Sequence, residues 1–183
     1  MLTNLPNLLT LSRIATIPVL VGLLYFHDPV TRWIGLVLFI AAGLTDYLDG
    51  YLARHRGEVS ALGRFLDPIA DKLLVASLIV MLVAIGDVAG LVVIPAIVIL
   101  CREILVSGLR EYLAEIKVPL PVSKLAKWKT AIQMVALGVL IVGEEAGPAL
   151  LPMQVIGDTG LWIAALLTLV TGYDYLARGL KHM

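Results

Sequence analysis

The residues best suited to chemistry are four aspartates in an otherwise largely apolar part of the chain, Asp46, Asp49, Asp67 and Asp71. The first two are three residues apart and the last two are four apart. Residues at these spacings share one face of a helix. Two such helices that turn back on each other would bring four carboxylates into one space, where they repel unless cations bind them. The pattern therefore predicts a site for hard divalent ions such as Mg²⁺, which often also bind substrate phosphates.

Residues beside the aspartates fit a ligand site of this kind. Gly50 and Gly63 leave room for a ligand to approach the backbone, and Arg54 adds positive charge at the entrance. A single aspartate more commonly belongs to a helix end or a turn, which is our interpretation of Asp28 and Asp87. That alternative does not account for four aspartates at two helical spacings.

A second group of residues is suited to binding an anion. Arg102 and Arg110 are eight residues apart in an apolar segment, which is a little over two helical turns, so both face nearly the same way. A buried arginine in a membrane span needs an anion, and guanidinium is well suited to phosphate. The alternatives are an internal pair with Glu103 or Glu111, or, for Arg110, a side chain that reaches the membrane surface.

Three lysines follow at the start of a later apolar segment, Lys124, Lys127 and Lys129. Lysines at the entrance of a span often do no more than contact lipid headgroups, and this is our interpretation of Lys124. For Lys127 and Lys129 the hypothesis is that they close the cationic pocket begun by the two arginines.

The composition indicates the element that must position these residues, the membrane-spanning helix. The chain has 183 residues, is 60% hydrophobic and has a mean hydropathy of +0.95, whereas soluble domains are usually about 45–50% apolar. Since a span needs about 20 apolar residues, we expect an all-α integral membrane protein with six transmembrane helices in one domain, residues 1–183. The expected spans are residues 7–26, 33–56, 62–85, 91–114, 123–142 and 156–177.

The basic residues predict the orientation of these spans. They lie near the connection between the second and third spans, near that between the fourth and fifth, and at the C-terminus: Arg54, Arg56, Arg64, Arg110, Lys117, Lys124, Lys127, Lys129, Arg178 and Lys181. The opposite connections offer Arg32 against Asp28, Asp87, Glu144 and Glu145. The positive-inside rule then places both termini and the aspartates on the cytoplasmic side. We expect a polar cavity that opens to the cytoplasm, in a multi-pass protein of the inner (cytoplasmic) membrane.

The aspartates and their neighbours match, at every defined position, the motif D-x2-D-G-x2-A-R-x8-G-x3-D-x3-D. This is the pattern of the CDP-alcohol phosphotransferases, membrane enzymes of phospholipid synthesis, which the chain resembles. The resemblance implies six spans, a homodimer, no nucleic-acid partner, and Mg²⁺ or Mn²⁺ at Asp46, Asp49, Asp67 and Asp71. It also implies that Asp71 is the general base that takes the proton from the acceptor hydroxyl.

The same resemblance implies where the CDP group of the donor binds. The residues expected to border it are Asp46, Asp49, Gly50, Ala53, Arg54, Gly63 and Asp67, together with Asn7 and Thr10 near the N-terminus. For Asn7 and Thr10 the alternative is helix capping, for which both residue types are favoured.

Three further segments narrow the resemblance, residues 4–13, 102–111 and 127–130. They look like the branch of the family that joins CDP-diacylglycerol to sn-glycerol 3-phosphate and releases CMP. The donor of such an enzyme lies in the lipid of the membrane. One small departure is Ala126, where glycine is expected. The resemblance implies that Arg102, Arg110, Lys127 and Lys129 bind the phosphate of the acceptor.

Other functions remain open at this point. Inositol phosphate or a second phospholipid also presents phosphate to a basic pocket, so the acceptor is not unique. A membrane prenyltransferase typically needs more spans than 183 residues provide and lacks the D-G-x2-A-R run. A cation transporter, whose aspartates would line an ion path, has no need of the arginine pocket. Release of CMP from CDP-diacylglycerol separates the first hypothesis from the last two.

Overall fold

The computed structural model describes residues 5–56, 61–118 and 123–182, and within them not the side chains of residues 5, 6, 46–56, 61, 62, 64 and 182. All regular structure in the described part is helical, which confirms the predicted all-α class. Six long helices coincide with the six expected spans and two short 3₁₀ turns accompany them. Their bounds are α1 Leu5–Tyr25, α2 Pro29–Arg56, α3 Ala61–Ala84, η1 Gly90–Val92, α4 Val93–Glu115, α5 Lys124–Ala146, α6 Met153–Gly179 and η2 Leu180–His182.

Helix length and composition agree with a multi-pass membrane protein. Within the described residues, four segments are long and apolar enough to cross a membrane: Asn7–Tyr25, Gly90–Glu115, Lys124–Ala146 and Met153–Gly179. Helix α2 is apolar over Pro29–Thr45 and then enters the aspartate motif. Helix α3 carries Asp67, Asp71 and Lys72 in its first half, so its apolar part is shorter. The two helices that carry the motif are therefore the two long helices that are not among these four segments.

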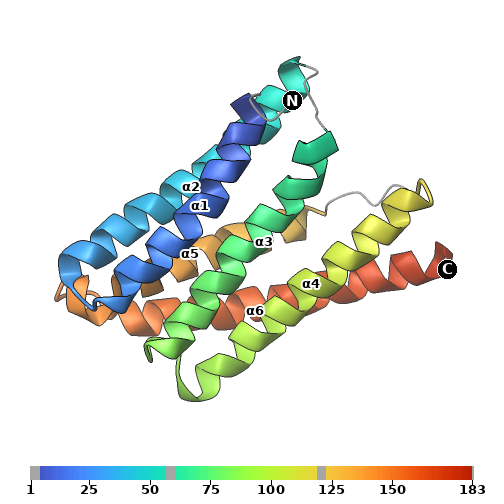
Figure 1. Cartoon of the computed structure of the whole chain (residues 1–183). Coiled ribbons are helices and arrows are strands. Elements are labelled where there is room, and N and C mark those ends of the chain that lie inside the picture. Colours follow the sequence, from blue (N-terminus) through green and yellow to red (C-terminus); the bar gives the residue numbers. More distant parts are fainter. Residues whose placement is uncertain (1–4, 57–60, 119–122, 183) are drawn as a thin grey trace.

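The six helices pack as a closed ring in the order α1, α2, α5, α6, α4 and α3, with α3 in contact with α1 again (Figure 1). Neighbours in the ring are thus often distant in the sequence, as α2 and α5 are. Helix α6 lies between α5 and α4. The ring order explains how motif residues on α3 and basic residues on α4 and α5 come to face one interior.

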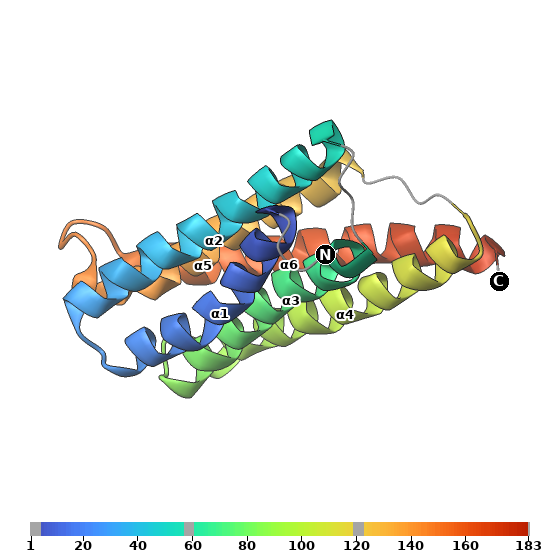
Figure 2. The same ribbon diagram turned by 45° about the horizontal axis from the view of Figure 1, so that its top comes forward.

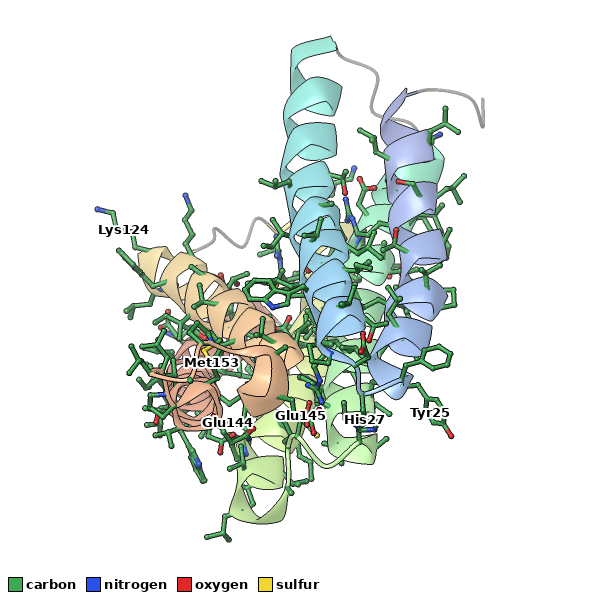
Figure 3. The ribbon with its side chains drawn as sticks, turned by 90° about the vertical axis from the view of Figure 1, so that its left-hand side faces the viewer. Tyr25, His27, Lys124, Glu144, Glu145 and Met153 are labelled. Carbon is green, nitrogen blue, oxygen red and sulfur yellow. The ribbon has the colours of Figure 1, made fainter. Side chains whose placement is uncertain are left out.

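Both halves of the aspartate motif lie at one end of the ring, which we call the motif end. The last turn of α2, the first turn of α3, the last turn of α4, the first turn of α5 and the last turn of α6 all lie there (Figure 2). The opposite end, which we call the far end, holds the other three connections. Charge separates in the same way, because Lys124 lies at the motif end whereas Glu144 and Glu145 lie at the far end (Figure 3).

The contact between α5 and α6 is close because small residues face each other there. A Cβ atom at Gly160 of α6 would lie 2.7 Å from the Cβ of Ala136 on α5, so a larger residue at position 160 would force the helices apart. Small residues at such crossings are typical of membrane helices, whose association depends on tight packing rather than on a hydrophobic driving force.

The far end is held by a buried ion pair that the sequence did not predict. Arg32 is only 1% exposed, and its Nη1 and Nη2 donate to the two carboxylate oxygens of Asp87, at 2.6 and 3.3 Å. Nη1 also lies 3.3 Å from the carbonyl oxygen of Ile141. Asp87 lies in the turn after α3, as predicted, whereas Arg32 belongs to α2 and not to the connection before it. The pair joins α2 to this turn and to α5.

The predicted end of the fifth span, residue 142, coincides with a break in α5. Gly143 has a non-helical conformation with φ +63°, and helix resumes after it and runs to Ala146. Glycine takes this left-handed conformation without strain, and a Cβ there would lie 2.8 Å from Nη1 of Arg32. The chain therefore bends around the arginine at Gly143 and continues as helix, so that the connection to α6 is shorter than expected.

Candidate active site

One face of α3 carries the second half of the aspartate motif. Gly63, Asp67 and Asp71 are spaced by four residues, so they lie about 6 Å apart along the helix axis on nearly one line. Gly63 is buried, and the side chains of Asp67 and Asp71 are half-buried. The helix continues through Pro68, which lies inside it. The prediction that Asp67 and Asp71 share a face is confirmed.

Helix α1 orients the first of these two aspartates. Thr10 is fully buried, and its hydroxyl donates to Oδ1 of Asp67 at 2.7 Å. We expected Thr10 to contact CDP or to cap a helix; the structure shows it in contact with a motif aspartate. Asn7 and Arg13, on the same stretch of α1, are buried as well, each 1% exposed. Arg13 was not among the predicted site residues, although a basic residue in an apolar helix was a signal for it.

The first half of the motif lies on α2, but its side chains are outside the described part of the chain. The backbone of Asp46, Asp49, Gly50, Ala53 and Arg54 belongs to the last three turns of α2. The convergence of four carboxylates therefore stays a prediction. Among the described side chains, no group of three or more potential metal ligands comes together.

The described aspartates nevertheless fit a divalent ion in their chemistry. Carboxylate oxygens are the ligands that Mg²⁺ and similar hard ions prefer. The bond from Thr10 occupies one side of Oδ1 of Asp67 and leaves Oδ2 for another partner. Asp71 makes no hydrogen bond or ion pair to the residues whose side chains are described. Both carboxylates thus keep oxygen atoms that a cation can use.

A polar pocket of about 320 Å³ lies beside the α3 face, between α3 and α4. It is lined by Pro68, Lys72, Arg102, Glu103, Val106, Ser107, Arg110, Glu111 and Ala114. The two arginines therefore share one cavity, as their spacing predicted. Lys72 adds a third cation that the sequence analysis missed, although it directly follows a motif aspartate. We call this cavity the cationic pocket.

Arg102 is held in place mainly by α6. Its Nη2 donates to Oγ1 of Thr171 at 3.1 Å, and its guanidinium carbon lies 5.5 Å from the centre of the Tyr175 ring. Its Nη1 is also 3.6 Å from Oε1 of Glu103. The internal pair that we considered as an alternative is thus present, but it leaves the arginine at the wall of the pocket. Neither Thr171 nor Tyr175 was predicted from the sequence.

The lysines of α5 are not both placed as predicted, because one is buried and the other is exposed. Lys129 is buried, with a side chain 3% exposed, and its Nζ pairs with Oε1 of Glu103. Lys127 is exposed and lines neither the cationic pocket nor the small pocket next to it. Residues two apart on a helix point about 200° away from each other, so both lysines cannot enter the same cavity from one straight helix.

The small pocket, about 30 Å³ in volume, adjoins the cationic pocket. Its lining includes Asp71, Lys129, Thr130 and Gln133, together with Lys72 and Glu103, which also line the cationic pocket. The carboxylate of Asp71 and the arginines of α4 therefore border adjoining pockets that share two charged side chains.

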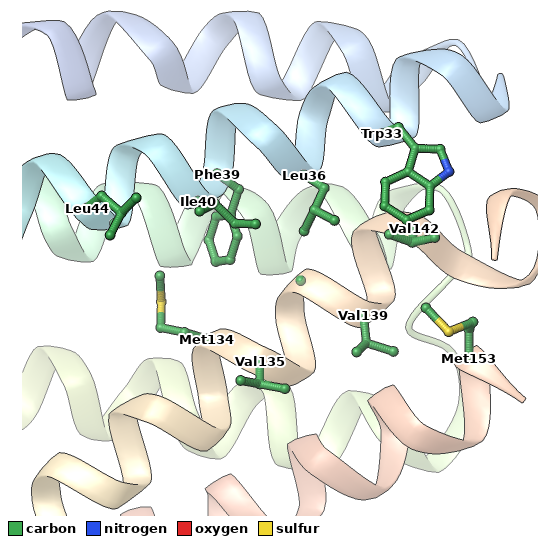
Figure 4. A pocket seen from close by; sticks show the side chains of 12 residues that line it. Trp33, Leu36, Phe39, Ile40, Leu44, Met134, Val135, Val139, Val142 and Met153 are labelled. Atoms are coloured by element: carbon green, nitrogen blue, oxygen red, sulfur yellow. The ribbon is translucent and has the colours of Figure 1, made fainter. Parts of the chain in front are cut away.

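A separate, apolar groove of about 510 Å³ lies between α2 and α5 (Figure 4). Its wall on α2 includes Trp33, Leu36, Ile40, Gly43 and Leu44. Leu44 is two residues before Asp46, so one end of the groove comes near the aspartate motif along α2. A long apolar chain can lie there while its polar end is at the motif.

A ring of membrane helices with aspartates next to a cationic pocket is the arrangement of a membrane enzyme that transfers phosphate-linked groups. Residues 3–170 match the CDP-alcohol phosphatidyltransferase family, and the chain belongs to this family. The family as a whole uses divalent metal ions.

Three curated relatives share a single name, CDP-diacylglycerol–glycerol-3-phosphate 3-phosphatidyltransferase. The relative from Rickettsia bellii is 51% identical, over 98% of this chain and 97% of its own. The relative from Cereibacter sphaeroides is 38% identical, over 98% and 97%, and that from Haemophilus influenzae is 38% identical, over 94% and 91%. The similarity thus covers nearly the whole of each protein and includes α6.

Proposed function

We propose that this protein transfers the phosphatidyl group from CDP-diacylglycerol to sn-glycerol 3-phosphate, giving phosphatidylglycerophosphate and CMP. The observation that carries the proposal is the shared lining of the two pockets. Lys72 and Glu103 border both the cavity of Arg102 and Arg110 and that of Asp71. An acceptor whose phosphate lies on the arginines then has its free hydroxyl near the carboxylate. The names of the relatives agree with this pair of substrates.

Asp71 serves as the general base in this proposal. Its carboxylate accepts the proton of the acceptor hydroxyl, whose oxygen attacks the phosphorus that bears the diacylglycerol. A bond from that phosphorus to the new oxygen forms, the pyrophosphate bond breaks, and CMP leaves with the electron pair. Transfers at phosphorus depend mostly on positioning and on stabilisation of charge, which the surrounding cations of α3, α4 and α5 supply.

Asp67 and Asp71 would hold a divalent ion, Mg²⁺ or Mn²⁺, together with Asp46 and Asp49. When bound, such an ion neutralises the pyrophosphate and stabilises the charge that builds up on the leaving CMP. Thr10 keeps Asp67 oriented for this task through its hydrogen bond to Oδ1. The residues of α2 from Asp46 to Arg54, with Gly63 and Asn7, would border the CDP group.

The size and charge of the cationic pocket support a small phosphorylated acceptor. Its volume of about 320 Å³ is at the lower end of the range for small-molecule sites, about 300–1,000 Å³. Lys129 is committed to Glu103, so Arg102, Arg110 and Lys72 remain as the main cations for one phosphate dianion. Inositol phosphate is the second candidate acceptor, because it presents the same group.

The donor lipid and the orientation complete the proposal. The acyl chains of CDP-diacylglycerol stay in the bilayer and have the apolar groove between α2 and α5 beside them. The motif end, with the basic residues, faces the cytoplasm, as the positive-inside rule favours. The resemblance to the family further supports a homodimer.

An acceptor panel with the purified protein and CDP-diacylglycerol tests the proposal. We expect CMP and phosphatidylglycerophosphate with sn-glycerol 3-phosphate, only in the presence of Mg²⁺ or Mn²⁺, and much less CMP with inositol phosphate or a phospholipid. Preference for another acceptor would overturn the substrate assignment but not the reaction. Full CMP release in excess chelator would overturn the role of the metal, and no CMP release with any acceptor would overturn the proposal as a whole.

A further inference from the structure

The guanidinium of Arg102 lies in a cradle formed by one face of α6. Thr171, Gly172 and Tyr175 belong to two successive turns of that helix, and each contacts a different part of the arginine. The hydroxyl of Thr171 accepts a hydrogen bond from Nη2 at 3.1 Å. The ring of Tyr175 lies 5.5 Å from the guanidinium carbon, within the distance at which cation–π attraction is effective. The arginine side chain itself is 12% exposed.

The hydrogen bonds of Thr171 fix the direction of its lone pairs. Its hydroxyl proton is directed to the carbonyl oxygen of Leu167 at 2.8 Å, with that of Thr168 at 3.2 Å. Because a hydroxyl has one proton and two lone pairs, the proton is used within the helix and the lone pairs remain for an acceptor role. Thr171 therefore acts towards Arg102 only as an acceptor, which is the role that a guanidinium requires.

Gly172 provides the space for the arginine stem. A Cβ atom at this position would lie 3.0 Å from Cγ of Arg102 and 3.5 Å from its Nε. With alanine at this position, the arginine stem would therefore have to shift by a few tenths of an ångström. The backbone of α6 and the stem of Arg102 lie as close as side chains allow, which leaves the guanidinium little freedom.

Tyr175 also connects the cradle to the start of α5. Its phenolic oxygen accepts a hydrogen bond from the backbone N–H of Ser123 at 3.3 Å, and the hydroxyl of Ser123 caps α5 by accepting from the N–H of Ala126. The tyrosine is buried, 6% exposed. The same residue thus contacts the arginine of α4 and the beginning of the helix that carries Lys129.

We infer that Thr171, Gly172 and Tyr175 are positioning residues for the acceptor: they hold the Arg102 guanidinium at the wall of the cationic pocket, where it binds the phosphate. This inference rests on the proposed function for the identity of the acceptor, and on geometry alone for phosphate binding. None of the three residues lines the pocket itself, so they act through Arg102. A helix outside the motif thereby takes part in substrate recognition.

Thr171→Val tests the inference, because valine keeps the shape and removes the acceptor oxygen. We expect the KM for sn-glycerol 3-phosphate to rise about tenfold, since hydrogen bonds to charged groups are among the stronger ones, while the KM for CDP-diacylglycerol changes less than about twofold. Thr171→Ser should restore the acceptor KM to near the wild-type value, because serine keeps the oxygen. Gly172→Ala should act in the same direction as Thr171→Val.

Thr168→Val is the matched control. Thr168 is buried on the same helix, one turn earlier, and its hydroxyl has no hydrogen-bond partner among the described residues. We expect both KM values to stay within about twofold of wild type. A purely structural role for these threonines would instead give similar losses for both variants and for both substrates, and that result would overturn the inference.

A double-mutant cycle asks whether Thr171 acts through Arg102. In an Arg102→Gln background, Thr171→Val should cause almost no further rise in the acceptor KM, since neighbouring residues in one network are not additive. Full additivity would overturn the inference.

Binding of inorganic phosphate separates this inference from the proposed function. Phosphate should raise the Tm of the wild type, as any ligand of the folded state does, and should raise it clearly less in Thr171→Val than in Thr168→Val. If that difference in Tm is found but sn-glycerol 3-phosphate causes no release of CMP, the proposed acceptor is wrong and the positioning role of the cradle is still supported. If phosphate protects both variants equally, the cradle is wrong whatever the acceptor.

Discussion

The two described aspartates of the motif, Asp67 and Asp71, have different surroundings although they are one turn apart. Asp67 has one oxygen held by the buried hydroxyl of Thr10 at 2.7 Å. Asp71 borders the small pocket with Lys72 and Lys129 and has no hydrogen bond to a described side chain. A carboxylate that is held firmly is suited to a fixed ligand, and one that is not held can take up a proton. This difference supports Asp71, rather than Asp67, as the base.

Asp71→Asn should lower kcat by at least about a hundredfold, because positioned proton transfer typically contributes 10²–10⁴-fold. Asparagine keeps the size and one oxygen but cannot take the proton, so CDP-diacylglycerol should still bind. Steady-state turnover and donor binding measure the two effects. Asp174→Asn, an exposed aspartate paired with Arg178 on α6, is the control and should be nearly normal. A loss of less than about tenfold in the first variant would exclude Asp71 as the base.

Arg110→Gln should raise the KM for sn-glycerol 3-phosphate by about ten- to a hundredfold, with little change in the KM for CDP-diacylglycerol. A charged hydrogen bond contributes about 1.5–3 kcal/mol, and glutamine cannot form the bidentate contact of arginine with phosphate. Lys124→Gln removes a charge from the same end of the protein and is the control, because Lys124 is exposed at the first turn of α5. Equal changes in both variants would mean that Arg110 acts only through the general charge at the membrane surface.

Sequence spacing correctly predicted which residues of α3 and of α4 lie together, but it did not predict that only one of Lys127 and Lys129 on α5 is buried. Arg102 and Arg110 lie eight apart on α4 and line one cavity, and Asp67 and Asp71 share a face of α3. Spacing did not predict contacts between helices. Nothing in the sequence around Thr171 indicates that Arg102 of another helix packs against it.

At the scale of the elements, the ring is held together by buried polar contacts at its far end as well as by apolar packing. We call the contacts of Arg32 with Asp87 and Ile141 the clamp. At the far end, Arg32 joins α2, α5 and the turn after α3 through Asp87 and the carbonyl of Ile141. Gln154 of α6 also donates to the backbone oxygen of Asp87, at 2.6 Å. Three helices and a turn thus meet at one buried polar point, about as far from the motif end as the helices allow.

Asp87→Ala should destabilise the protein by about 3 kcal/mol or more, because it leaves the buried guanidinium of Arg32 without its partner. For a chain of this size that corresponds to a fall in Tm of about 6–12 °C, measurable by thermal unfolding in detergent. Both KM values should be unchanged, since the pair is far from the site. The control is Glu145→Gln: its side chain is 61% exposed, 3.8 Å from Arg32, and such pairs contribute about 0–1 kcal/mol. Equal Tm values for the two variants would contradict the role of the clamp.

The bounds of the helices could be predicted from apolar runs to within a few residues, except where a buried contact decides them. Helix α5 is interrupted directly after its predicted end, at Gly143, where a positive φ bends the chain around Arg32, and it then resumes as far as Ala146. The sequence shows a glycine there, which fits a helix end equally well. The deciding factor is the arginine of α2, and its position follows only from the packing of the ring.

At the scale of the whole molecule, the ends of the ring differ in charge and therefore in the side of the membrane that they should face. Lys124 lies at the motif end and Glu144 at the far end (Figure 3). The ring order itself, in which α2 is next to α5 and α6 lies between α4 and α5, could not be predicted from the sequence. All six helices are apolar over much of their length, so hydrophobicity does not distinguish one neighbour from another.

Single cysteines should report this orientation in cells. With Cys101 replaced by serine, Glu144→Cys should react with a membrane-impermeant maleimide in intact spheroplasts, and Lys124→Cys should react only after the membrane is permeabilised. The reason is that basic ends are retained in the cytoplasm. Labelling of the unpermeabilised cells, read by gel shift, decides the matter. The reverse pattern would place the motif end outside.

The position of α6 between α4 and α5 also has a consequence for how the protein is made in the cell. The helices that carry the aspartates leave the ribosome first and can insert while the rest of the chain is still being translated. The cradle for Arg102 is absent until α6 has been synthesised and has moved in between two helices that are already in the membrane. The aspartate half of the site can therefore form early during biogenesis, whereas the surroundings of Arg102, which we propose to bind the acceptor phosphate, are completed last.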